Sequence, residues 1–91
     1  MSYSLIFAPR AMSDLEKIKK SGNQARLKKL RVILEELREH PLTGIGNPER
    51  LRYRPDTYSR RISDKDRIIY SVHDEVVIVN ILQMLGHYDD K

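Results

Sequence analysis

The chain has 91 residues, enough for one domain with a modest core but too few for two domains that each bury their own. It contains no cysteine, so disulfides and thiolate zinc sites are excluded, and apolar packing in a reducing compartment is expected. Seventeen Lys and Arg against thirteen Asp and Glu give a net charge of +4, which favours a polyanion or an acidic protein as partner.

No segment has the pattern of a signal peptide or a membrane span. The apolar run at residues 5–8 stops at Pro9, which is too short for the hydrophobic region of a signal peptide. The run at residues 76–85 is interrupted by Asn80 and Gln83 and reaches only half of the roughly twenty residues that a span needs. We therefore expect a cytoplasmic protein with one domain, residues 1–91, and no membrane partner.

The N-terminal part predicts a strand followed by two helices. Residues 3–8 are β-prone, and Pro9 then suits the first turn of a helix, where its missing N–H is tolerated. Apolar residues at helical spacing continue until Gly22 ends this first helix. Asn23 opens a longer helix that Pro41 ends. Its apolar stripe consists of Leu27, Leu30, Ile33, Leu34 and Leu37.

The C-terminal part predicts four strands, at residues 49–53, 58–63, 67–73 and 75–85. Their connections are short and polar, as in an antiparallel meander. The last two strands are nearly apolar throughout, so we expect them at the centre of the sheet. The implied fold is an α+β domain, in which an N-terminal strand and a helix hairpin pack on one face of a largely antiparallel sheet. The other face is expected to be an open, concave and basic surface.

The polar residues beside these strands offer the groups that cut RNA without a metal. That chemistry needs a base for the 2′-hydroxyl proton, a cation for the charge on the phosphorane and an acid for the leaving 5′-oxygen. Glu49, Arg61, Arg67, and His87 with Tyr88 supply these types. Structural explanations compete: a solvated strand end for Glu49, an ion pair across the turn for Arg67 and an ordinary terminal tail for His87.

Strand geometry restricts which arginines can share a site. Arg60 and Arg61 point to opposite faces, so at most one of them lies in any given site, and the other is expected to be a surface cation. Arg61 and Arg67 share a face only if paired residues have numbers of equal parity. A three-residue turn at 64–66 would give that register.

Metal and cofactor sites are not indicated. His40, His73 and His87 do not have the spacing of a metal site and no cysteine joins them. Gly44 and Gly46 precede no phosphate-binding helix and lack the rest of a nucleotide fingerprint. We expect neither a metal nor a cofactor.

Four separated motifs resemble the YoeB/Txe branch of the RelE/ParE toxin superfamily. They are PLTGIGNPERL at 41–51, YSRRI at 58–62, DRIIY at 66–70 and GHY at 86–88. Their order and spacing agree with that family over essentially the whole chain. The resemblance implies the microbial-ribonuclease-like fold and a toxin of a type II toxin–antitoxin system. It also implies ribosome-dependent cleavage of mRNA in the A site.

Carried onto this sequence, the family's roles make Glu49 the general base, Arg67 the transition-state cation and His87 the general acid. Tyr88 and Arg61 would orient the RNA or bind phosphate. Further RNA contacts are expected from Arg52, Tyr58 and Arg60. The implied partners are a cognate acidic antitoxin, mRNA and the 70S ribosome with its rRNA. Related toxins form dimers, so a homodimer is included.

One segment departs from the family, and two other functions remain open. Residues 54–57 read Arg-Pro-Asp-Thr where many relatives have a Gly and an aromatic, so no base-stacking role follows for this loop. The first alternative is a ParE-like gyrase poison, a group that generally lacks this Glu and His-Tyr set. The second is a basic module that binds RNA or the ribosome without chemistry. Glu49 argues against such a module, because a carboxylate in an RNA groove repels phosphate.

Overall fold

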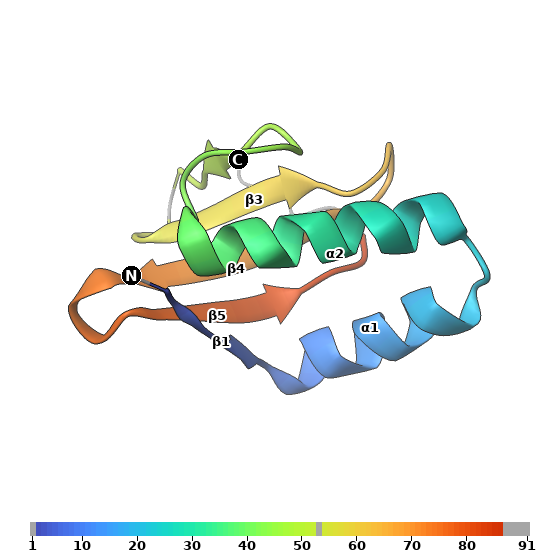
Figure 1. Cartoon of the computed structure of the whole chain (residues 1–91), viewed down its shortest axis with the longest axis horizontal. Coiled ribbons are helices and arrows are strands. Elements are labelled where there is room, and N and C mark those ends of the chain that lie inside the picture. The colour runs from blue at the N-terminus through green and yellow to red at the C-terminus, as the bar shows by residue number, and fades with distance from the viewer. Residues whose placement is uncertain (1, 53, 87–91) are drawn as a thin grey trace.

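Two helices lie against one face of a five-stranded sheet, and this is the expected α+β arrangement (Figure 1). The computed structural model describes residues 2–52 and 54–86. The elements are β1 (Ser4–Phe7), α1 (Pro9–Lys20), α2 (Gln24–Glu39), β2 (Glu49–Arg50), β3 (Thr57–Arg61), β4 (Arg67–His73), a 3-10 turn (Asp74–Val76) and β5 (Ile78–Gln83).

The helix ends follow from the residues that occupy them. Pro9 is the first residue of α1, a position whose N–H has no partner within the helix, so its absence in proline costs no hydrogen bond. Asn23 caps α2, since its side chain accepts a hydrogen bond from the Arg26 amide at 3.0 Å. Three lysines lie in the last turn of α1, where they face the partial negative charge of the helix C-terminus.

The strand order in the sheet is β1-β5-β4-β3-β2, with β4 at the centre and β5 beside it, as expected from their apolar sequences. Three of the four strand pairs are antiparallel. The exception is β1, which pairs with β5 in parallel, so that Ser4 lies opposite Ile78. Strands from the two ends of the chain therefore lie side by side (Figure 1).

The expected strands at residues 49–53 and 75–85 are shortened the most. β2 ends at Arg50, although the Leu51 amide still bonds to the Thr57 carbonyl and so continues the antiparallel register with β3. β5 begins only at Ile78, because the 3-10 turn and Val77, at φ 56°, separate it from β4. Pattern alone does not locate these ends, since neither turn is marked by glycine and Val76 and Val77 are β-prone.

The core lies between the helices and the sheet. The helices contribute Ala11, Ile18, Leu30, Ile33 and Leu37, and the sheet contributes Ile68, Tyr70, Val72, Val79 and Ile81. The opposite face was expected to be open, but Ser59 and Ile69 on that face are each only 1% exposed. In the part of the chain that the structure describes, no helix is long and apolar enough to cross a membrane.

Candidate functional site

Glu49 and Arg67 come together on the sheet face that the helices do not cover. Glu49 lies opposite Ser59, so that side chains of β2 and β3 share this face. The Arg67 Nη1 atom is 3.4 Å from the Ser59 hydroxyl and 3.7 Å from a Glu49 carboxylate oxygen. The side chain of Glu49 is 52% exposed and that of Arg67 is 23% exposed. Carboxylate and guanidinium are thus accessible to a ligand from solvent.

Arg61 and Arg67 lie directly opposite each other on neighbouring strands. The register pairs residues of equal parity, as the sequence argument required for a shared face, and the turn spans residues 62–66. Like charges at opposed positions repel each other, and a bound anion would relieve this repulsion. Arg61 is exposed, so its charge is available for such an anion.

Arg60 does not belong to this site, which corrects two expectations. Its side chain is fully buried on the helix-facing side, so it is neither an RNA contact nor a surface cation. It donates to the Glu36 carboxylate at 2.7 Å and to the Tyr70 hydroxyl at 3.1 Å. It also donates to the backbone carbonyls of His40, Thr43 and Ile45. These bonds use all five of its N–H groups inside the protein.

Tyr58 is also directed away from the Glu49 face. It lies opposite Tyr70, and the two rings stack with centroids 5.9 Å apart. Tyr58 is half-buried against the core, so the expected contact with RNA is not supported by its position. Burial raises the pKa of Tyr70, although the hydrogen bond and the charge of Arg60 partly oppose this effect.

The loop before Glu49 is shaped by close packing that the sequence did not reveal. A Cβ atom on Gly44 would lie 2.0 Å from the Glu36 carboxylate and 2.7 Å from Arg60, so only glycine fits there. The Arg61 amide donates to the Gly46 carbonyl at 2.6 Å, which ties the loop to β3. From this loop the Asn47 amide donates to Glu49 at 3.0 Å. The loop thereby orients the carboxylate.

Three expected site residues remain, namely Arg52, His87 and Tyr88. Arg52 is exposed in the segment between β2 and β3. His87 and Tyr88 lie outside the described residues. The residue before His87 is Gly86, whose amide donates to Asp66 at 3.0 Å and whose carbonyl accepts from the Arg67 amide at 3.1 Å. Gly86 therefore lies beside Arg67.

Positive charge is concentrated at the turn between the two helices. Among residues 2–52 and 54–86, no group of three His, Cys, Asp or Glu side chains could hold a metal ion. Residues 17–31 contain seven Lys and Arg and no Asp or Glu, so the net charge of this segment alone is larger than the +4 of the whole chain. The positive charge of residues 17–31 would attract a polyanion.

Comparison with known proteins gives a family. The family described as "YoeB-like toxin of bacterial type II toxin-antitoxin system" matches residues 7–88. Toxin YoeB of Escherichia coli O6:H1 is 33% identical over 54 residues, which are 58% of this chain and 64% of that protein. The matched stretch therefore spans less than two thirds of that relative.

Several solved structures have the same fold as this chain over nearly its whole length. The YoeB dimer from Staphylococcus aureus superposes with a TM-score of 0.79 at 31% identity, covering 97% of this chain and 100% of that one. The YoeB–YefM complex from the same organism gives 0.75 at 32% identity, with the same coverage. An archaeal RelE–RelB complex from Pyrococcus horikoshii, at 0.74 and 21% identity, shares the fold, covering 94% of this chain and 96% of that chain. The chain belongs to the YoeB-like toxins of bacterial type II toxin–antitoxin systems.

Proposed function

We propose that this protein is a ribosome-dependent endoribonuclease, which cuts mRNA in the A site through the 2′-hydroxyl and needs no divalent metal in the chemical step. The main support is the pair of Glu49 and Arg67, 3.7 Å apart on an accessible face. A carboxylate beside a guanidinium can take a proton from a hydroxyl while the cation stabilises the charge that develops on phosphate.

The proposed reaction needs a base, a cationic pair and an acid. Glu49 takes the 2′-proton as the 2′-oxygen bonds to phosphorus, and Arg67 with Arg61 neutralises the charge on the nonbridging oxygens. The bond from phosphorus to the 5′-oxygen then breaks, and His87 protonates that oxygen. The products are a 2′,3′-cyclic phosphate and a 5′-hydroxyl. Tyr88 and Arg52 are proposed to orient the RNA.

The distribution of charge supports RNA and the ribosome as partners. The segment 17–31 carries seven cations and lies on the helix hairpin, whereas Glu49 and Arg67 lie on the other side of the sheet. A protein that holds rRNA with one surface and mRNA with another needs cations in both places, since each phosphate contact gains from counterion release.

Glu49→Gln is expected to lower the cleavage rate roughly 10²- to 10⁴-fold, the usual contribution of one acid–base group. The same change removes a negative charge, so mRNA and ribosome binding is expected to be unchanged or tighter. Cleavage is measured by primer extension on programmed ribosomes, and binding by co-sedimentation.

Glu16→Gln is the matched control, because Glu16 is exposed on α1 and the substitution changes the net charge equally. It should leave cleavage unchanged. Full cleavage by folded Glu49→Gln would exclude Glu49 as the base. If no cleavage of mRNA were found with any ribosome complex, a non-catalytic module or a gyrase poison would be favoured, and gyrase inhibition would separate these two.

We also propose that an acidic antitoxin covers the basic surface of this chain. The support is the charge of residues 17–31 and the solved YoeB–YefM complex of a 32% identical relative. Expression without an antitoxin is expected to arrest bacterial growth, measured as colony-forming units after induction. Glu49→Gln expressed to the same level should restore growth. Normal growth with abundant folded wild-type protein would contradict the toxic activity.

A further inference from the structure

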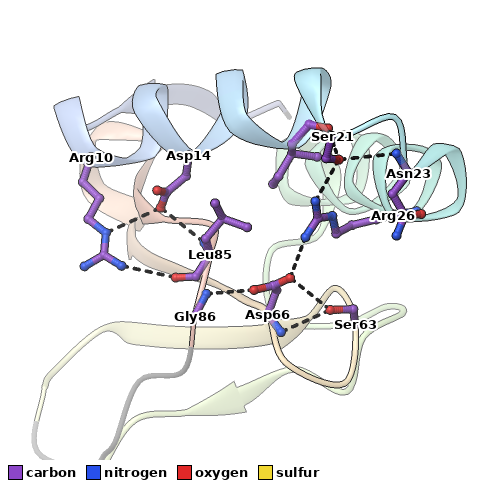
Figure 2. A network of polar contacts seen from close by, with 10 residues as sticks. Arg10, Asp14, Ser21, Asn23, Arg26, Ser63, Asp66, Leu85 and Gly86 are labelled. Carbon is purple, nitrogen blue, oxygen red and sulfur yellow. Dashed lines mark hydrogen bonds and ion pairs between the residues drawn. The ribbon is translucent and has the colours of Figure 1, made fainter.

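The three amides that follow β5 are held by carboxylates rather than by a neighbouring strand (Figure 2). One Asp14 oxygen accepts from the Met84 amide at 3.0 Å and from the Leu85 amide at 3.2 Å. Asp66 accepts from the Gly86 amide at 3.0 Å. Hydrogen bonds from backbone N–H to an ionised carboxylate are stronger than those between neutral groups. The path of residues 84–86 is therefore fixed by two side chains.

Both carboxylates are themselves held in place. Asp14 projects from α1, its side chain is 5% exposed, and the Arg10 guanidinium lies 3.6 Å away. Asp66 accepts from Arg26 at 2.8 Å and from the Ser63 hydroxyl at 3.2 Å (Figure 2). Each therefore couples residues 84–86 to another part of the fold: Asp14 to the first helix, and Asp66 to the second helix and the turn between β3 and β4.

Asp66 remains ionised at neutral pH. Burial raises its pKa, but the hydrogen bonds from Gly86, Arg26 and Ser63 and the charge of Arg26 together outweigh burial and leave the pKa below its ordinary value. A carboxylate with a lowered pKa loses its negative charge only in acid, below the ordinary range for Asp. Its bond to the Gly86 amide is therefore charge-assisted wherever ribosomes work.

The Asp66 contact also connects Gly86 to Arg67. Asp66 binds the Gly86 amide, and the amide of the next residue, Arg67, donates to the Gly86 carbonyl at 3.1 Å. The same Arg67 extends its side chain to Ser59 and Glu49. Gly86 has φ 84°, a conformation that favours glycine, so the chain turns at this point. One turn thus holds the residue before His87 and presents the cation of the site.

We propose that Asp66, supported by Asp14, is a positioning residue for the acid step of the proposed reaction, because it holds Gly86, the residue before His87 in the sequence, beside Arg67. The inference rests on the proposed function, because His87 acts as an acid only in that reaction. Asp66 itself does not touch the substrate. Arg67 is also held by its pairing with Arg61 in the sheet, so loss of Asp66 should impair protonation of the leaving oxygen and leave the other steps intact.

The test compares two leaving groups at one mapped cleavage position. Ribosomes are programmed with mRNA containing either the natural linkage or a sulfur in place of the 5′-oxygen. A thiol has a pKa of about 8.5, so a thiolate leaves without an acid, whereas an alkoxide needs one. The variants are Asp66→Ala, Asp66→Asn, His87→Gln and, as matched control in the same turn, Asp64→Ala, whose side chain is exposed.

On the natural linkage we expect kcat to fall roughly 10²- to 10⁴-fold in His87→Gln and roughly 10- to 100-fold in Asp66→Ala, since a misplacement of about 1 Å has effects of this size. KM should be unchanged. On the sulfur linkage both variants should approach the wild-type rate. Asp66→Asn keeps an oxygen for the Gly86 amide and should recover much of the loss. Asp64→Ala should match wild type on both substrates.

The ratio of the two rates within one variant does not depend on how much of that protein is folded. A uniform loss of activity in Asp66→Ala on both linkages would show a merely structural role and overturn the inference while leaving His87 as the acid. If His87→Gln gained nothing from sulfur, the acid role of His87 would be wrong and the inference would fall with it. If the sulfur linkage restored the rates of both Asp66→Ala and His87→Gln and Asp64→Ala behaved as wild type, the acid role of His87 and the positioning role of Asp66 would both be supported.

Discussion

A single 2′-deoxy nucleotide on the 5′ side of the scissile phosphate is expected to block cleavage of an mRNA that this protein otherwise cuts. The 2′-oxygen is the nucleophile of the proposed reaction, and Glu49 can activate only a hydroxyl that is present. The measurement is primer extension on ribosomes programmed with the two mRNAs. Mapping the ends of the natural product should show a 2′,3′-cyclic phosphate or 3′-phosphate upstream and a 5′-hydroxyl downstream.

The control is the same mRNA with the deoxy substitution one nucleotide further downstream, which leaves the nucleophile in place and should be cut normally. Chelation is unsuitable for testing metal dependence, because ribosomes need Mg²⁺ to stay assembled. Replacement of Mg²⁺ by a polyamine or cobalt hexammine tests it instead, and cleavage is expected to persist. Cutting of the deoxy mRNA at the normal rate would contradict the roles of Glu49 and His87 together.

Arg60→Met is expected to destabilise the fold by about 3–5 kcal/mol, the usual result of removing one partner of a buried ion pair. Methionine fills similar space but donates nothing, so the Tyr70 hydroxyl loses a donor, as do Glu36 and three loop carbonyls. For a domain of this size each kcal/mol lowers the melting temperature by about 4–8 °C. Thermal unfolding followed by circular dichroism measures the loss.

Arg61→Met is the matched control, because Arg61 is the next residue along β3 and is exposed. It should change the free energy of unfolding by no more than about 0.5 kcal/mol, as is usual for surface positions. Equal effects of the two substitutions would mean that the buried contacts of Arg60 contribute little. A large effect of Arg61→Met alone would contradict the assignment of the two faces.

The architecture was predictable because local patterns fix it. The helix beginnings at Pro9 and Asn23 and the leucine stripe of α2 depend only on neighbouring residues, and the structure has each of them. The central position of β4 and β5 follows from their apolar composition. The parallel pairing of β1 with β5 was not predicted, since no local pattern reports which distant strand an edge strand will join.

The candidate site was predictable only where it depends on local strand alternation. Strand alternation correctly separates Arg60 from Arg61, but it does not say which of them faces the helices. That choice depends on Glu36, a residue far away in the sequence that binds Arg60. The same information is missing for Tyr58, whose ring packs beside Tyr70 and not among the expected RNA contacts. The roles of Asp66 and Asn47 likewise appear only when the turns are folded.

The parallel pairing of β1 with β5 also bears on when the sheet can be completed. β5 follows every other strand in the chain yet lies between β1 and β4, so the N-terminal strand has no place in the sheet until residues 78–83 have left the ribosome that makes them. Contacts between such distant segments also form slowly, because a large loop must close first. The sheet is therefore completed only after its last strand has been synthesised.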